Sequence, residues 1–126
     1  MTDKLSCVRE GNVAVVTLDD GKANAMGFEM LSGINEMLDN VEHEYEAMVL
    51  LGREGVLSGG FDLKVIQGGD GQEIQRLVTL GVKTIMRIYG FPLPVVTAAT
   101  GHAVALGGFF LLASDYRFGV SGEFKI

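Results

Sequence analysis

Short apolar runs alternate along this sequence with amphipathic helical patterns, and this alternation limits the fold more than any other feature. Residues 13–18 and 47–51 are β-rich apolar runs bounded by charge or glycine. Between them, apolar residues recur at the spacing of one helix face. They are Leu31, Ile34, Leu38 and Val41. Strands that alternate with helices predict an α/β fold.

The rest of the chain continues the pattern. A second long helix is expected over residues 72–89, with Pro92 and Pro94 ending it. Its apolar stripe is predicted to contain Ile74, Leu77, Val78, Val82, Ile85 and Tyr89. Further strands are expected at residues 5–9, 56–60, 95–99 and 116–119. After a turn at Gly101, residues 103–106 lead to Gly107-Gly108, and short helices are expected after Asp62 and at residues 109–114.

Length and composition exclude several classes of protein. The 126 residues fit one domain or a piece of one. The net charge of −6 argues against binding to a nucleic-acid backbone. A single cysteine, Cys7, excludes an internal disulfide and suggests a reducing compartment, so a cytoplasmic protein is expected. Residues 1–10 lack the apolar run of a signal peptide.

Residues 94–114 are mostly apolar, as a membrane span would be. A spanning helix needs about 20 predominantly apolar residues. Here Gly101, Gly107 and Gly108 interrupt the run. We therefore expect buried strands, a tight turn and a buried helix, and no membrane partner.

Two glycine pairs carry the candidate chemistry, Gly59-Gly60 and Gly107-Gly108. Each pair follows a predicted strand and precedes a helix, so a ligand could approach the main chain closely. Amides at a helix start favour anions, and two of them aimed at one point could hold an oxyanion. The simpler alternatives are a strand-to-helix turn at the first pair and close helix packing at the second.

Several motifs together resemble the crotonase family, the enoyl-CoA hydratase/isomerase superfamily. Residues 57–63, Leu-Ser-Gly-Gly-Phe-Asp-Leu, resemble its Phe-Ser-Ala-Gly-x-Asp-Leu pattern. Residues 101–108 resemble its Gly-x-Ala-x-Gly-Gly-Gly segment, and Asn24-Ala25-Met26 resembles its Asn-Ala-Leu loop. The resemblance covers essentially the whole chain. It implies that residues 1–126 form an incomplete ββα spiral, truncated before the C-terminal helices.

The resemblance also implies a site. Phe61 N–H and Gly108 N–H would form the oxyanion hole for the thioester carbonyl. The coenzyme A part of an acyl-CoA substrate would lie against Ala23, Ala25, Phe61, Asp62, Leu63 and Lys64. Lys64 has the alternative of being a solvated helix charge. No metal and no permanently bound cofactor are implied, and intact family members form trimers or hexamers.

The chain departs from the family at the catalytic acids. Hydratases of the family use two glutamates, of which the first falls at Leu111 and the second lies beyond Ile126. Leucine transfers no proton. The full-length protein could therefore be an isomerase with one acid. The alternatives are a non-catalytic acyl-CoA-binding protein or fragment and a CoA-thioester hydrolase of the same fold.

Overall fold

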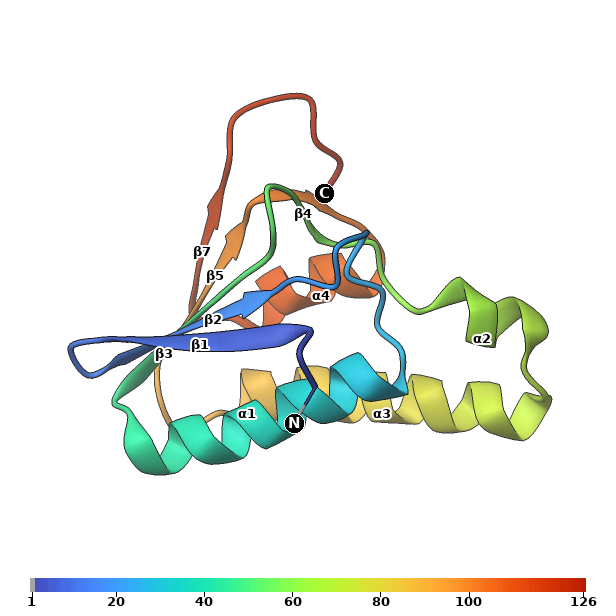
Figure 1. The fold of residues 1–126 in the computed structure, drawn as a ribbon, viewed down its shortest axis with the longest axis horizontal. Helices are drawn as coiled ribbons and strands as arrows, with labels where there is room; N and C mark the ends of the chain where they lie inside the picture. Colours follow the sequence, from blue (N-terminus) through green and yellow to red (C-terminus); the bar gives the residue numbers. More distant parts are fainter. Residues whose placement is uncertain (1) are drawn as a thin grey trace.

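The computed structural model describes residues 2–126 as two sheets and the helices that pack around them (Figure 1). In the larger sheet, β1 (Leu5–Glu10) and β2 (Val13–Leu18) form an antiparallel hairpin. Parallel strands β3 (Ala47–Leu51), β5 (Val95–Ala99) and β7 (Tyr116–Gly119) complete the order β1-β2-β3-β5-β7. The predicted α/β class is confirmed.

The smaller sheet contains β4 (Gly55–Ser58) and β6 (Gly101–Ala103), which run parallel. Their backbones lie very close, because a Cβ on Gly101 would be 2.0 Å from the carbonyl carbon of Gly55. Only glycine fits at that position. The second sheet therefore depends on the glycine that the sequence places at the predicted turn.

Four helices follow or connect these strands. They are α1 (Phe28–Glu44), α2 (Leu63–Gly68), α3 (Gly71–Tyr89) and α4 (Leu106–Ala113). In Figure 1, α1 and α3 run side by side beneath the larger sheet, and α2 lies beyond one end. The predicted cap of α2 is confirmed, since Asp62 Oδ1 accepts from Lys64 N–H at 3.0 Å. The predicted buried stripe of α1 is also confirmed.

The predicted stripe of α3 is wrong in part. Leu77 is buried, but Val82 and Tyr89 are 53% and 69% exposed. The buried positions are Leu77, Gly81, Thr84 and Ile88. Small residues face inward because α3 packs closely against α1 and α4, and the larger apolar residues consequently lie outside.

The apolar stretch of residues 94–114 forms β5, β6 and α4, as predicted. Within residues 2–126, no helix combines the length and apolarity that crossing a bilayer requires. However, α4 begins at Leu106 rather than Phe109. Gly107 and Gly108 therefore lie inside its first turn.

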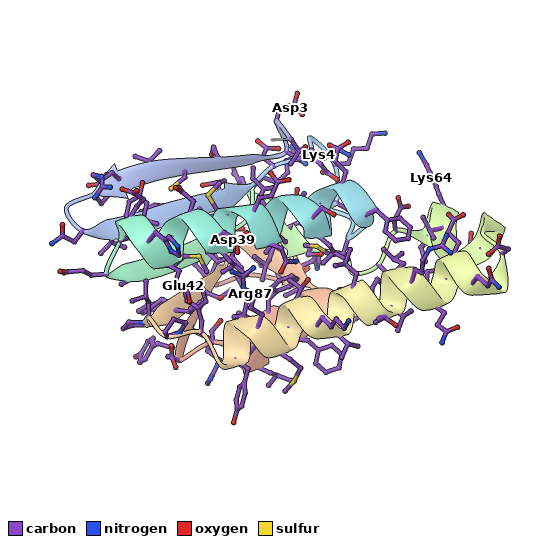
Figure 2. All side chains as sticks on the ribbon, turned by 90° about the horizontal axis from the view of Figure 1, so that it is seen from below. Asp3, Lys4, Asp39, Glu42, Lys64 and Arg87 are labelled. Atoms are coloured by element: carbon purple, nitrogen blue, oxygen red, sulfur yellow. The ribbon has the colours of Figure 1, made fainter. Side chains whose placement is uncertain are left out.

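A polar network joins α1 to α3 (Figure 2). Asn35 Nδ2 donates to Thr84 Oγ1 at 2.7 Å, and Thr84 Oγ1 donates to Leu80 O at 2.8 Å. Arg87 donates to Asn35 O at 3.0 Å and also binds the Asp39 carboxylate. Thr84 is fully buried, and its hydroxyl bonds both to the half-buried amide of Asn35 and to Leu80 O, so its own polar atom is satisfied.

We expect Thr84→Val to lower the free energy of unfolding by about 0.5–1.5 kcal/mol, since the half-buried side-chain amide of Asn35 loses an acceptor. Thr79→Val, at an exposed position of the same helix, should change it by less than about 0.5 kcal/mol. Urea unfolding measures both. Equal effects at the two sites would contradict the role assigned to the network.

Candidate functional site

Asn24 organises the loop between β2 and α1. Its backbone has a φ of 51°, in the left-handed region that asparagine tolerates better than most residues. The buried side chain donates to Leu18 O at 2.9 Å and to Leu57 O at 3.0 Å. These bonds hold the loop against the ends of β2 and β4. Asn24 belongs to the Asn-Ala-Met motif, but the motif alone does not show that its side chain anchors the loop.

The turn after β4 is held by Ser58 and Gly60. Ser58 Oγ donates to Asn24 O at 2.8 Å and accepts from Gly60 N–H at 3.1 Å. Gly60 has a φ of +98°, and its carbonyl accepts from Met26 N–H at 2.8 Å. Among the described residues, Phe61 N–H then has no protein acceptor. The turn therefore presents one free backbone donor beside the loop.

The first turn of α4 presents the second free donor. Gly107 N–H donates to Val104 O and Gly108 N–H to Ala105 O, each at 2.9 Å. Leu106 N–H, at the helix start, has no acceptor in the part of the chain that is described. This amide lies close to the first donor, since a Cβ on Gly60 would be 3.5 Å from Leu106 N.

This arrangement corrects the predicted pair of donors. Phe61 N–H is free, as the prediction requires, but Gly108 N–H is already hydrogen-bonded within the helix. The reason is the earlier start of α4, which places Gly108 in the helix and Leu106 at its tip. Leu106 was not expected to be a donor, because a glycine pair before an apolar run usually indicates a turn that precedes the helix.

A cleft of about 570 Å³ lies beside the turn after β4. All six residues predicted to contact coenzyme A line it, namely Ala23, Ala25, Phe61, Asp62, Leu63 and Lys64. Lys4 and Lys22, which sequence analysis did not single out, line it as well; Figure 2 labels Lys4 and Lys64. Lys4 also pairs with Glu29 at 3.5 Å. The cleft is therefore lined by three lysines, of which Lys4 is paired, and also by the carboxylates of Asp20, Glu29 and Asp62.

Leu111 does not occupy the predicted position at the pocket. Its side chain belongs to the hydrophobic core and is only 7% exposed. Phe109 is 51% exposed and lines an apolar hollow with Met86 and Leu112. Since Phe109 follows Leu106 by three residues, it shares the helix face of the free amide. No side chain from residue 106 to residue 113 carries an ionisable group.

Asp20, in the loop that lines the cleft, has a lowered pKa. Burial raises the pKa of Asp20, but hydrogen bonds from the amides of Lys22, Asn24 and Ala25 lower it by more, with help from the charge of Lys4. The pKa therefore lies below its ordinary value of 3.8. The ionised carboxylate holds the loop through these amides, at 2.7, 3.0 and 3.2 Å.

We expect Asp20→Asn to destabilise the protein at neutral pH and to do so less as the medium becomes acidic. A lowered pKa means that the stabilisation is present above the unfolded-state pKa, about 3.9, and is lost as the pH falls through the lower folded-state value. Urea unfolding of both forms between about pH 7 and pH 3 measures this. A difference that stays constant below about pH 4 would exclude the carboxylate as its source.

Comparison with known proteins tests the family resemblance of the motifs. The family model for enoyl-CoA hydratase/isomerase matches residues 8–120. A putative enoyl-CoA hydratase from Thermus thermophilus is 35% identical over 115 residues, covering 86% of this chain and 45% of that protein. A carnitinyl-CoA dehydratase from Salmonella enteritidis is 31% identical over 120 residues, with 92% and 45% covered.

Solved structures are similar as well. A probable enoyl-CoA hydratase from Mycobacterium tuberculosis is 40% identical, with a TM-score of 0.88 over 91% of this chain and 49% of that one. An enoyl-CoA hydratase/isomerase family protein from Pseudomonas syringae is 38% identical, with a TM-score of 0.93 over 97% and 53%. The chain thus spans about half the length of these relatives. Sequence, fold and motif order agree, and the chain belongs to the enoyl-CoA hydratase/isomerase family.

Proposed function

We propose that the protein binds an acyl-CoA thioester in the cleft and stabilises its enolate with two backbone amides, Phe61 N–H and Leu106 N–H. The observation that carries this proposal is the pair of unbonded donors at neighbouring backbone positions. Family membership supports the choice of a thioester, since the relatives are named for reactions of enoyl-CoA and carnitinyl-CoA.

The two donors suit the chemistry of an enolate. When a proton leaves the α-carbon, negative charge develops on the thioester oxygen. Fixed N–H groups about 2.7–3.1 Å from that oxygen stabilise the charge without reorganising. Leu106 N–H stands at the N-terminus of α4, where the helix dipole adds to the stabilisation.

The cleft suits the coenzyme A portion. Lys22 and Lys64, for which the structure of residues 2–126 shows no carboxylate partner, supply positive charge for its phosphates. The six residues implied by the family motifs supply the contact surface. Coenzyme A would enter as part of the substrate, so no permanently bound cofactor is required.

The missing carboxylate on α4 favours a reaction with one acid–base group. If Leu106 is the second donor, the position of the first family glutamate moves from Leu111 to Phe109. Neither side chain transfers a proton, so the inference of a missing acid holds in both alignments. A double-bond isomerisation, with its acid from outside these 126 residues, is then favoured over hydration. The same lack of an acid favours, as second candidate, an acyl-CoA-binding protein without turnover.

Exposed apolar side chains support assembly of the whole protein. Met86, Tyr89 and Leu112 line a hollow of about 200 Å³ on α3 and α4. Exposed apolar surface of this kind is typical of an interface with another subunit. We propose that the whole protein forms trimers or hexamers in the cytoplasm. Size-exclusion chromatography with light scattering tests this, and a stable monomer would contradict it.

The second donor can be tested by removing one N–H group. In the protein expressed from its whole reading frame, we expect Leu106→Pro to lower kcat about 10²–10³-fold more than Leu106→Ala, because proline lacks the N–H. The alanine variant controls for the lost side chain. If Gly108→Pro lowers kcat while Leu106→Pro matches Leu106→Ala, Gly108 is the donor after all.

The reaction type is tested with crotonyl-CoA and a 3-enoyl-CoA as substrates. We expect isomerisation of the second to exceed hydration of the first, because one acid is missing. Phe109→Glu should then raise hydration by up to about 10²-fold, the lower part of the range for a positioned acid.

Leu111→Glu is the matched control for this gain. It should lower the free energy of unfolding without raising hydration, because it buries a carboxyl group in the core. Fast hydration by the unmodified protein would contradict the missing-acid argument. Binding of both thioesters without any turnover would favour the non-catalytic alternative.

A further inference from the structure

Gly81 is a glycine in the middle of α3, where a glycine weakens a helix. It is buried, and it faces the two segments that hold the free amides. A Cβ added at Gly81 would lie 2.5 Å from Cε1 and 2.6 Å from Cζ of Phe61, and 3.2 Å from Cδ2 of Leu106. The side chains of Phe61 and Leu106, whose backbone amides are the proposed donors, therefore both pack against α3 at Gly81.

The backbone that carries the ring of Phe61 has little freedom to move at this contact. The backbone on either side of Phe61 is tied to Met26, since Met26 N–H donates to Gly60 O at 2.8 Å and Asp62 N–H donates to Met26 O at 3.1 Å. The ring is half-buried against the core, and Phe61 also lines the cleft. A larger residue at position 81 would thus either turn the ring toward the cleft or shift the peptide that carries the amide.

We propose that Gly81 is a positioning residue for the two backbone donors. It leaves room for the large side chain at position 61 and fixes the distance between the turn after β4 and the start of α4. Gly81 touches no substrate and acts only through Phe61 and Leu106. This role rests on the proposed function of those amides.

Gly33 provides a matched control on the neighbouring helix. A Cβ at Gly33, in the middle of α1, would lie 2.5 Å from Leu5 Cδ1 and 2.6 Å from Thr2 Cγ2. The overlap is of the same size, and again with side-chain atoms, but it lies at β1 and the N-terminal segment. Gly33→Ala therefore creates similar crowding without reaching the two amides.

In the protein from the whole reading frame, Gly81→Ala should lower kcat by about 10–10²-fold, the loss expected from displacing a site by about 1 Å. KM should change less than kcat, because the rest of the cleft is intact. Gly33→Ala should leave kcat within about twofold of the starting protein. A KM increase with an unchanged kcat would mean that the ring only obstructs the cleft, and would overturn the proposal.

A double substitution tests the contact itself. Phe61→Leu has its own cost, but in that background Gly81→Ala should change kcat by no more than about twofold, because the crowded ring is gone. If Gly81→Ala costs as much in the Phe61→Leu background as in the starting protein, its effect does not pass through the ring and the proposal fails.

Amide NMR signals can be measured without enzymatic turnover, so they test the role of Gly81 independently of the proposed activity. With ¹⁵N-labelled phenylalanine and leucine, the amide signals of Phe61 and Leu106 should move in Gly81→Ala and stay in place in Gly33→Ala. Unmoved signals in Gly81→Ala, or equal movements in both variants, would overturn the role of Gly81. A starting protein that turns over neither thioester would overturn the proposed function, and the amide signals would still decide the role of Gly81.

Discussion

Close contact between the backbone of residues 55–60 and that of residues 101–107 underlies the rest of the structure. A Cβ on Gly107 would lie 2.2 Å from Ser58 O, and one on Gly60 would lie 3.0 Å from Val104 O. Side chains normally keep two such segments apart. Without them, β4 and β6 pair in parallel and the tip of α4 reaches the turn after β4. The two free amides are neighbours because this contact is so short.

Polar groups around the contact hold it in one conformation. Asn24 and Ser58 are fully buried, and each forms hydrogen bonds to backbone groups of the adjoining segments. Within residues 2–126, Gly60 N–H donates to Ser58 Oγ and Asp62 N–H donates to Met26 O, and Phe61 N–H between them is left without an acceptor.

The departures from sequence-based expectation occur where helices pack closely. Hydrophobicity placed Val82 and Tyr89 on the buried face of α3, yet the buried face carries Gly81 and Thr84. A helix that approaches its neighbours closely needs small residues at the contact, and hydrophobicity alone does not reveal this. The start of α4 was misplaced for a related reason. Two glycines usually suggest a turn, but here Gly107 lies in a helix. Glycine is needed at this helical position because Ser58 O of β4 leaves no space for a side chain.

The sequence by itself determined the α/β class, the buried stripe of α1, the cap at Asp62 and the family motifs that identify the residues around the cleft. These features follow from local spacing and from residue types that have few alternatives. Only the tertiary structure decided which amide of α4 is free, which face of α3 is buried and that Leu111 lies in the core. Those outcomes depend on distances between segments far apart in the chain, and one-residue shifts of a helix start change them completely.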